Sequence, residues 1–340
     1  MHDPQLPERV NPPGAATDAP RAPKVSVIIP NYNHARYLPR RIESVLGQQM
    51  QDLEVLLMDD CSTDDSRTVL AAYAARDPRV RLAFNEHNSG STFRQWAKGL
   101  ALTRGEYVWI AESDDFAEPG FLTALVARLD ADPTAALAYA NSWLVDEHDA
   151  VHGTMADWKN RDFATSHWAH SHRADGTEEL RRYLSIACTI NNASAVLFRR
   201  RSLAAVGVDT SFRYTGDWLV YIRLCGVGAL AYEAACLSNY RDHSANASKQ
   251  SVADGTLLYE RLKCCAHLHR SGQLDAAAYE HLLSWSSREL VALSFLLLRQ
   301  RREPRKWWAF LRGIAAVDAE FYRRLRNRAV RQFVQSKLRG

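Results

Sequence analysis

The sequence predicts an α/β domain whose sheet is mostly parallel, with helices on both faces, followed by a helical C-terminal extension. Two observations predict this fold. Between residues 24 and 140, short apolar segments alternate with amphipathic ones, which is the pattern of strand–helix–strand units in a parallel sheet. From about residue 255 onward, apolar residues recur with a helical period and no strand-like segment interrupts them.

The first two strands are predicted from apolar runs. Residues 25–30 (VSVIIP) and 53–58 (LEVLLM) are short and almost wholly apolar, as expected of strands that are buried on both faces of a sheet. Between them, the apolar residues of segment 38–46 fall on one face of a helix. After the second strand, Ser62 or Thr63 is the expected N-cap of the next helix.

The same alternation continues through the next three strands. Residues 80–84 (VRLAF) and 106–111 (EYVWIA) are predicted strands, separated by a helix over 92–103 whose large apolar residues face inward. A further helix is expected over 119–130, because its proline stands where the first helical turn tolerates one. Residues 135–140 (AALAYA) complete this part of the sheet as another predicted strand.

Composition excludes several classes of protein. The chain has 340 residues, 46% hydrophobic and 24% charged, which is typical of a globular protein and not of a disordered or fibrous one. Its longest apolar run, Leu290–Leu298, is about half of what a membrane-spanning helix needs. The N-terminus lacks the apolar core of a signal peptide, and the six cysteines form no CxxC pair. We therefore expect a cytoplasmic protein with reduced thiols.

The regions outside the alternating pattern differ from it in composition. Residues 1–23 contain six of the twelve prolines and are predicted to be a disordered lead-in. Residues 141–250 are irregular and rich in Trp, His, Asn and Asp, which suits a substrate-facing region better than a second sheet domain. Residues 251–340 are predicted to form a helical, basic C-terminal region.

Polar and acidic residues follow the predicted strands where each one ends. The segment Pro30-Asn31-Tyr32-Asn33 follows the first strand, Asp59 and Asp60 the second, and Glu112-Ser113-Asp114-Asp115 the fourth. The carboxyl ends of parallel strands meet at one edge, where such sheets bind ligands. Crowded carboxylates need a cation, and oxygen ligands suit Mg²⁺ or Mn²⁺, which in turn attracts a diphosphate. Any one of these residues alone could instead be a helix cap or a turn former.

Two common phosphate-binding motifs are absent from the sequence. No GxGxxG follows the first strand, and no GxxxxGK[ST] occurs. These absences argue against a dinucleotide-dependent dehydrogenase and against a P-loop NTPase. Phosphates would have to be held by a metal and by side chains.

At this point a family resemblance can be stated. The segments VSVIIPNYNHARYLPRRIESVLGQQ, LEVLLMDDCSTDDS and NSGSTFRQWAKGLALTRGEYVWIAESDD resemble the nucleotide-binding half of family 2 glycosyltransferases with the GT-A fold, of the bacterial surface-glycan type. The resemblance continues through NNASAVLFRR, TGDW and YRDHSANAS. It covers roughly residues 24–250 and implies a nucleotide-binding half (24–140) and an acceptor half (141–250).

The resemblance implies roles for residues on the donor side. The donor-binding residues would be Pro30, Tyr32, Asn33, Asp60, Arg94 and Asp114. Among them, Asp60 would accept a hydrogen bond from the base, usually uracil, and Asp114 would hold the ribose. The donor would then be a nucleotide-diphosphate sugar, in most cases a UDP-sugar.

The resemblance also implies a metal site for Mg²⁺ or Mn²⁺. Asp115 would ligate the ion that bridges the diphosphate, and His243 in YRDHS matches a position where some relatives offer an imidazole. Many relatives have Asp-x-Asp-Asp where this chain has Glu112-Ser113-Asp114-Asp115. Glu112 keeps the charge of the first position and can still bind a metal.

The general base and the acceptor residues come from the later motifs. An acceptor hydroxyl must lose its proton as it attacks, and Asp217 in TGDW stands where the family places its base. From the residues alone, N-cap of the following helix is an equally good role for Asp217; the resemblance favours the base. Trp218, Asn191 and Asn192 are the expected acceptor-side residues, although the two asparagines could equally tie down a loop.

Five histidines between residues 148 and 172 do not have the spacing of a standard zinc site. With Trp158 and Trp168, they are interpreted as part of an acceptor-binding loop or of a variable loop. The histidines are His148, His152, His167, His170 and His172.

The C-terminal tail has a charge of its own. Residues 291–340 hold 13 Lys or Arg against 3 Asp or Glu, whereas the first 290 residues carry a net charge of −6. Basic residues interleaved with Trp307, Trp308 and Phe310 are typical of helices at an anionic membrane surface. A helical face that packs on the protein or on a partner subunit is an equally good interpretation. No nucleic-acid-binding motif accompanies the charge, so nucleic acid is not an expected partner.

These observations together predict an inverting, metal-dependent glycosyltransferase that acts on a glycan or lipid-linked acceptor. If the tail binds lipid, the protein would be peripheral at the inner face of the cell membrane. One alternative is a non-catalytic sugar- or partner-binding module on the same fold. A sugar nucleotidyltransferase is a weaker alternative, because PNYNHARYL lacks the Gly- and Arg-rich loop and the lysine that would hold a triphosphate.

Overall fold

The computed structural model describes residues 21–190, 192–243, 255–299 and 304–338; within these, the side chains of 295–299, 304–306 and 333–338 are left out. The predicted lead-in lies almost wholly outside the described residues, as does the predicted domain boundary at residue 250.

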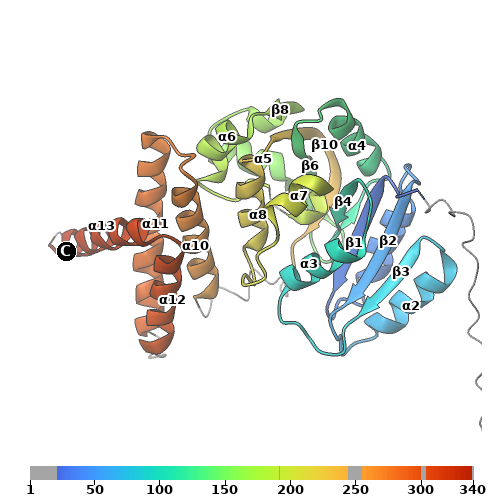
Figure 1. Cartoon of the computed structure of the whole chain (residues 1–340), viewed down its shortest axis with the longest axis horizontal. Helices are drawn as coiled ribbons and strands as arrows, with labels where there is room; N and C mark the ends of the chain where they lie inside the picture. Colours follow the sequence, from blue (N-terminus) through green and yellow to red (C-terminus); the bar gives the residue numbers. More distant parts are fainter. Residues whose placement is uncertain (1–20, 191, 244–254, 300–303, 339–340) are drawn as a thin grey trace, which may run out of the picture.

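Within the described residues, ten strands form one mixed sheet with helices on both faces (Figure 1). The path through the sheet is β3-β2-β1-β4-β9-β6-β10-β5, with β7 beside β6 and β8 beside β10. The strands are β1 (Val25–Asn31), β2 (Leu53–Asp59), β3 (Val80–Phe84), β4 (Tyr107–Ile110), β5 (Phe116–Ala117), β6 (Ala135–Val145), β7 (Val151–Thr154), β8 (His172–Ala174), β9 (Val196–Arg199) and β10 (Ala229–Arg241). The predicted α/β fold with a mostly parallel sheet is confirmed.

Most of the long strands run in one direction. β1 pairs in parallel with β2 and β4, β2 with β3, and β6 with β10. β9 lies antiparallel between β4 and β6, so β4 and β6 also point the same way. The carboxyl ends of β1, β2, β4 and β10 therefore meet at one edge of the sheet, which is where the predicted site residues follow.

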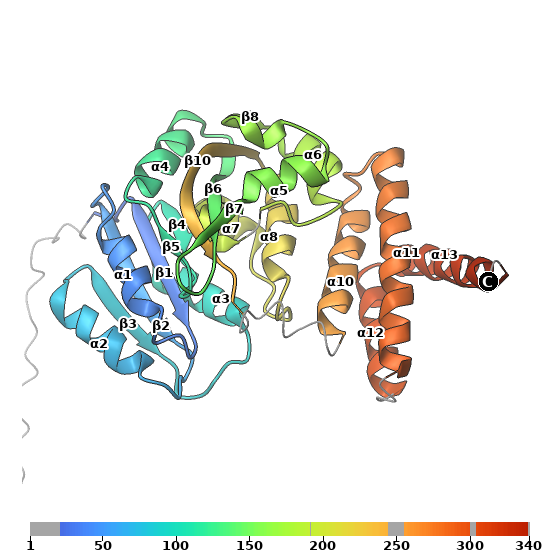
Figure 2. The same cartoon turned by 180° about the vertical axis from the view of Figure 1, so that it is seen from behind.

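The alternation of side chains along β1 explains why both faces of the sheet are covered. Val25, Val27 and Ile29 enter the apolar core under α1, α2 and α4, whereas Ile28 enters the opposite core under α3 and α8. Because every residue of β1 is buried, the strand reads as a continuous apolar run. Figure 2 shows α1 and α2 on the side of the sheet away from α8.

The helices and helical turns of the chain follow this order. The helices are α1 (Leu38–Leu46), α2 (Ser66–Arg76), α3 (Thr92–Leu102), α4 (Phe121–Ala131), α5 (Met155–Asp162), α6 (Gly176–Glu179), α7 (Arg200–Val206), α8 (Gly216–Cys225), α10 (Thr256–Ser271), α11 (Ala276–Arg299), α12 (Pro304–Val317) and α13 (Ala319–Leu338). The short helical turns are η1 (His167–Ala169), η2 (Leu180–Leu184) and η3 (Ala193–Ala195).

Two expectations about local structure are wrong. Neither Ser62 nor Thr63 caps α2, because the helix begins only at Ser66 and Ser62 Oγ accepts a hydrogen bond from the backbone N–H of Asn33 at 2.9 Å. The region after residue 141 is also not merely irregular, since it contributes β9 and β10 to the same sheet. β10 escapes a pattern search because its register shifts at three points, between residues 229 and 238, and the side-chain alternation shifts with it.

The C-terminal helices continue the core on the α8 side. Leu262 and Leu268 of α10 and Phe321 of α13 are fully buried in the same apolar cluster as Leu219 of α8. Both views show α13 extending away from the rest of the molecule (Figures 1 and 2). Among the described residues, no helix combines the length and the apolar character that a membrane span requires.

Candidate active site

The strand ends bring the predicted polar residues together at one edge of the sheet. Asn31 and Asp59 lie opposite each other in the β1–β2 pair, and the backbone N–H of Asp60 donates to the carbonyl of Asn31 at 2.9 Å. On the other side of β1, Ala111 at the end of β4 donates to the carbonyl of Ile28 at 2.8 Å. The segment from Glu112 to Asp115 therefore begins directly beside the end of β1.

Asp114 faces two histidines from distant parts of the chain. Its Oδ2 lies 3.0 Å from His243 Nε2, just beyond the end of β10, and His34 Nδ1 lies 2.8 Å from Ser113 Oγ. One ligand atom from each of His34, Asp114 and His243 lies within 4.8 Å of the other two. Burial alone would raise the pKa of Asp114, but the hydrogen bond from His243 and the charges of both imidazoles lower it. The carboxylate is thus ionised and faces two nitrogen donors, a set that fits a divalent cation.

Asp115 is occupied by protein donors. Its Oδ2 accepts a hydrogen bond from Asn192 Nδ2 at 2.6 Å, and its Oδ1 accepts one from the backbone N–H of Arg241 at 2.8 Å. Its side chain is buried, and this burial, together with the charge of Asp114, raises its pKa to about 6. Asp115 thus ties η3 and the end of β10 to the strand end. Asn192 serves in this tie, whereas Asn191 lies outside the described residues.

Beneath the acidic cluster lies a buried arginine that the sequence analysis did not single out. Arg41 of α1 is fully buried; its Nε donates to the carbonyl of Glu112 at 2.7 Å, and an η nitrogen donates to Ser194 Oγ at 2.9 Å. Burial lowers the pKa of Arg41 to about 10, against the pull of the nearby carboxylates. The guanidinium therefore offsets part of the negative charge of the cluster from inside the protein.

Glu112 lies between this cluster and Asp217. Burial is the main reason that its pKa is well above the usual value, and the charges of Asp115, Asp114 and Asp217 raise it further. Its backbone is fixed by Arg41 and by Ser194, whose Oγ accepts from the N–H of Glu112 at 3.0 Å. Glu112 is not part of the cluster of ligand atoms around Asp114.

The predicted donor residues lie along the ends of β1 and β2. Pro30 is buried in β1, whereas Tyr32 is 46% exposed and Asn33 is also exposed, with a positive φ of 57°. Asn33 Oδ1 accepts a hydrogen bond from the N–H of Thr63 at 2.7 Å, which joins the two strand ends. Arg94 is exposed on α3 and donates to the carbonyl of Ser89 at 3.0 Å.

Asp60 organises the loop that carries Arg94. Its Oδ1 accepts hydrogen bonds from Asn85 Nδ2, from the backbone N–H of Ser89 and from Gln95 Nε2 at 2.7, 2.8 and 2.9 Å. Its Oδ2 accepts one from Ser89 Oγ at 2.7 Å. Since a carboxylate oxygen can accept two hydrogen bonds, Oδ2 retains capacity for a further donor.

Asp217 occupies the first turn of α8. Thr215 is the N-cap residue, so the alternative role of Asp217 as N-cap is wrong. Its Oδ1 accepts from the backbone N–H of Trp218 at 2.8 Å. Burial raises the pKa of Asp217 from the usual 3.8 to about 7, against the Trp218 hydrogen bond and with the help of the charge of Glu260. A carboxylate of this pKa can take up a proton near neutral pH.

The chain before Asp217 is packed closely against α3. A Cβ on Gly216 would meet the ring of Phe93 at 2.8 Å, so only glycine allows α8 to begin this close to α3. Trp218, which was expected to face the acceptor, is instead 2% exposed, and its indole N–H donates to the carbonyl of Leu184 at 2.9 Å. Its ring belongs to the core because it lies on the inner side of α8, and the acceptor role is a correction to the prediction.

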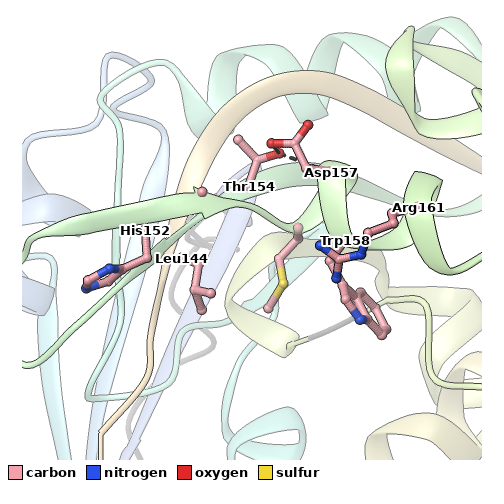
Figure 3. Close-up of a pocket in the computed structure, with 8 residues that line it drawn as sticks. Leu144, His152, Thr154, Asp157, Trp158 and Arg161 are labelled. Carbon is pink, nitrogen blue, oxygen red and sulfur yellow. Dashed lines mark hydrogen bonds between the residues drawn. The ribbon is translucent and has the colours of Figure 1, made fainter.

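A separate open pocket lies beside β7 and α5 (Figure 3). Its volume is about 520 Å³. Its walls combine apolar and charged side chains: Leu144, His152, Thr154, Met155, Asp157, Trp158 and Arg161, with the backbone of Gly153. Of the two tryptophans of the predicted acceptor loop, Trp158 lines this pocket, whereas Trp168 is 1% exposed and donates its indole N–H to Tyr139 Oη at 3.0 Å.

Comparison with known proteins identifies the family. Residues 26–207, more than half of the chain, match the family model described as "Glycosyl transferase family 2". The "Glycosyltransferase GlyG" of Streptococcus pneumoniae serotype 4 is 27% identical over 231 residues, which cover 57% of this chain and 76% of the relative. The chondroitin synthase of Escherichia coli is 33% identical over 138 residues, 41% of this chain and only 20% of the synthase.

Solved structures of the same architecture extend the comparison to the C-terminal region. Residues 1–349 of TarS from S. aureus, in complex with UDP-GlcNAc, superpose with a TM-score of 0.63 at 18% identity, covering 87% of this chain and 83% of that one. The mannosyltransferase PcManGT from Pyrobaculum calidifontis, in complex with GDP-Man and Mn²⁺, superposes with a TM-score of 0.56 at 16% identity, covering 92% and 88%. At these identities the likeness is one of fold. The chain belongs to glycosyl transferase family 2, and it is a glycosyltransferase with the GT-A fold.

Proposed function

We propose that this enzyme is an inverting, metal-dependent glycosyltransferase that transfers a sugar from a UDP-sugar to a hydroxyl group of a glycan or lipid-linked acceptor. The observation that carries the proposal is Asp217, a half-buried carboxylate whose pKa is raised by burial to about 7 and whose charge is felt by Glu112 at the strand edge. The proposal of a nucleotide-sugar donor is supported by the complexes of TarS with UDP-GlcNAc and of PcManGT with GDP-Man.

On the donor side, the exposed Tyr32 and Asn33 and the buried Pro30 beneath them would form the nucleotide-binding surface. Asp60 would accept a hydrogen bond from the base through Oδ2, the oxygen that has only one donor. Arg94 is exposed beside this loop and would contact the donor's diphosphate. Each of these roles is consistent with the contacts of the residue.

For the metal, we propose His34, Asp114 and His243 as ligands, and we reassign Asp115 and Glu112 to positions around the site. The three proposed ligands offer atoms within 4.8 Å of one another, whereas both oxygens of Asp115 already accept hydrogen bonds from protein donors. A bound Mg²⁺ or Mn²⁺ would offset negative charge on the diphosphate of the donor. The ribose contact expected of Asp114 is then not needed for the proposal.

In the transfer step, a carboxylate oxygen of Asp217 accepts the proton of the acceptor hydroxyl as the hydroxyl oxygen attacks the anomeric carbon. A new bond forms between that oxygen and the anomeric carbon. The bond from the anomeric carbon to the diphosphate oxygen breaks, and its electron pair leaves with the nucleoside diphosphate. Because attack comes from the face opposite the leaving group, the anomeric configuration inverts.

The basic C-terminal helices would bring the enzyme to its acceptor. α13 buries Phe321, Leu325 and Ala329 on one side and exposes Arg323 and Arg326 on another. This helix would lie against an anionic membrane surface, at which a lipid-linked acceptor is found. The enzyme would then be cytoplasmic and peripheral at the inner face of the cell membrane.

A thermal-shift panel with UDP, GDP, dTDP and CMP, each with and without Mn²⁺, tests the donor site first. A nucleotide that binds only the folded state raises the melting temperature. We expect UDP with Mn²⁺ to give the largest increase. The Asp217→Asn variant should keep this increase but lose sugar transfer. No shift with any nucleotide, in folded protein, would contradict the proposed donor site; transfer by Asp217→Asn at the wild-type rate would contradict the assignment of the base.

A further inference from the structure

A second cluster of metal-binding side chains lies far from the donor site. His167 of η1, His172 of β8 and Glu179 of α6 each offer one ligand atom, and these atoms lie within 4.8 Å of one another. β8 pairs with the start of β10, where His172 lies opposite Tyr232, whereas His243 follows the end of β10. The length of β10 thus separates the two clusters by roughly 30 Å. Figure 1 shows β8 and α6 together at one end of the sheet.

His172 is oriented as a metal ligand is. Its Nδ1 lies 2.9 Å from the backbone carbonyl of His170, a contact that requires a proton on Nδ1 because a carbonyl can only accept. In the neutral ring this leaves the lone pair on Nε2. That Nε2 atom is buried and has no hydrogen-bond partner in the described structure. Metal-ligating histidines typically donate their other N–H to a carbonyl in this way.

Glu179 supplies a buried carboxylate that is only half satisfied. Its residue is 2% exposed; Oε2 lies 3.0 Å from His167 Nε2, and Oε1 is buried without a hydrogen-bond partner. A buried carboxylate with an unpaired oxygen is costly unless a cation compensates it. The cluster therefore contains two unpaired acceptor atoms, on His172 and on Glu179, beside the imidazole of His167.

The nearest buried lysine does not fill this gap. Lys159 Nζ donates to the carbonyl of Thr189 at 3.3 Å and lies about equally close to the rings of Tyr139, Trp168 and Tyr232, at 5.4, 5.0 and 5.3 Å from their centroids. Among the described residues, it forms no ion pair with Glu179. Burial lowers the pKa of Lys159 to about 7, against the charge of Glu179, so a neutral amine is accessible there near neutral pH.

We infer that His167, His172 and Glu179 form a second metal site, which binds Zn²⁺ and is structural. Two imidazole nitrogens and one carboxylate are a zinc donor set, and a water molecule would complete four-fold coordination. The ion would hold η1, β8 and α6 together, and through β8 it would hold this segment on the edge of the sheet. It would take no part in sugar transfer, because the site lies at the opposite end of β10.

Zinc binding by the full-length, tag-free protein tests this inference. After treatment with EDTA and removal of the chelator, the protein is titrated with Zn²⁺ in competition with a chromophoric chelator. The same titration on Asp114→Asn/His243→Ala removes the contribution of the first cluster. We expect this variant to retain one equivalent of bound zinc. That equivalent should disappear when His172→Ala or Glu179→Gln is added, and His170→Ala should leave it in place, because only the backbone of His170 contacts the cluster.

Melting temperature provides a second measurement that does not depend on activity. Zn²⁺ should raise the melting temperature of Asp114→Asn/His243→Ala, and this increase should be absent once Glu179→Gln is added. Since the titration of Asp114→Asn/His243→Ala itself leaves the second cluster intact, misfolding of the other variants does not obscure the result. No bound zinc in that folded protein would overturn the inference, as would zinc binding that is unchanged by both His172→Ala and Glu179→Gln.

Discussion

The carboxylate of Glu260, on α10 of the C-terminal region, accepts a hydrogen bond from the backbone N–H of Thr215, two residues before Asp217. This bond is 2.9 Å long, and the same carboxylate also accepts from the N–H groups of Arg213 and Tyr214 at 2.6 and 2.8 Å. Glu260 is 2% exposed, so these bonds are shielded from water. The C-terminal helices therefore fix the segment that leads to the proposed base.

Replacing Glu260 should change both the rate of transfer and its pH dependence. Glu260→Gln leaves three backbone donors with a neutral amide, and misplacing a catalytic group by about 1 Å can cost about a hundredfold in rate. We expect kcat to fall between about tenfold and a hundredfold, with little change in the KM of the donor. Because the charge of Glu260 raises the pKa of Asp217, the acidic limb of the rate profile should also move to lower pH.

The matched control for this experiment is Glu280→Gln, the same substitution at an exposed glutamate of α11. It should leave the rate and its pH profile unchanged. A merely structural role of Glu260 would lower the amount of folded protein without moving the pH profile. An unshifted profile in folded Glu260→Gln would therefore contradict the coupling between Glu260 and Asp217.

The raised pKa of Asp217 predicts opposite effects of pH on activity and on stability. The base acts when it is deprotonated, so kcat should fall below about pH 7, the pKa to which burial raises Asp217. In the unfolded chain Asp217 loses its proton near its usual pKa of 3.8, so the free energy of unfolding should decrease as pH rises from about 4 to 7.

Asp217→Asn removes this pH-dependent cost. Its free energy of unfolding at pH 8 should exceed that of the wild type by on the order of 3 kcal/mol, while the difference should shrink toward pH 4. Denaturant unfolding at several pH values measures it. An equal difference at pH 4 and pH 8 would show that ionisation of Asp217 is not the cause.

Asp114 and Asp115 should respond differently to the same substitution. Asp114→Asn removes a charged ligand from the cluster with His34 and His243, so UDP should still bind weakly but the additional increase in melting temperature from Mn²⁺ should be lost. Asp115→Asn places an amide against two donors, Asn192 Nδ2 and the N–H of Arg241, and should cost about 1–3 kcal/mol of stability.

The comparison separates a ligand from a positioning residue. In Asp115→Asn the Mn²⁺-dependent increase should survive, although from a lower starting temperature. The reverse outcome, with metal dependence lost in Asp115→Asn and kept in Asp114→Asn, would restore the ligand role that the sequence motif alone suggests for Asp115. Thermal shifts with UDP, with and without Mn²⁺, measure both variants.

The strands at the start of the chain could be predicted from sequence because burial on both faces leaves an unbroken apolar signal. β1 and β2 are such strands, and the polar residues that follow them lie at the predicted edge. β10 could not be predicted, because its burial alternates and its register shifts. The pattern of a strand is readable only where the environment of its side chains is uniform.

The site was predictable in its residues and not in its contacts. Asp114 and His243 were both expected at the site, but their pairing depends on the path of β10, which brings residues 129 positions apart to 3.0 Å. His34 gave no signal, because a lone histidine after a strand resembles any surface residue. Arg41 appeared to belong to an ordinary amphipathic helix, and only its complete burial marks it as the counter-charge of the acidic cluster.

The exposed basic face of α13 leads to a prediction about membranes. Arg323 and Arg326 are exposed, whereas the neighbouring Arg324 is engaged with Glu320. Near an anionic membrane each basic residue contributes about 1 kcal/mol. Arg323→Glu/Arg326→Glu reverses two charges, so its partition into vesicles of anionic lipid should fall by at least about tenfold in a sedimentation assay, with transfer to a soluble acceptor unchanged.

The control is the same change of charge elsewhere on the molecule. Arg76 of α2 and Arg201 of α7 are exposed and lie outside the C-terminal helices, so Arg76→Glu/Arg201→Glu alters the net charge equally. If binding depends on net charge alone, both double variants will lose affinity to the same extent. A selective loss in the α13 variant supports a basic surface that faces the lipid; binding that is weak in the wild type and insensitive to salt would favour the packing of α13 on a partner subunit, because an electrostatic membrane contact weakens as ionic strength rises.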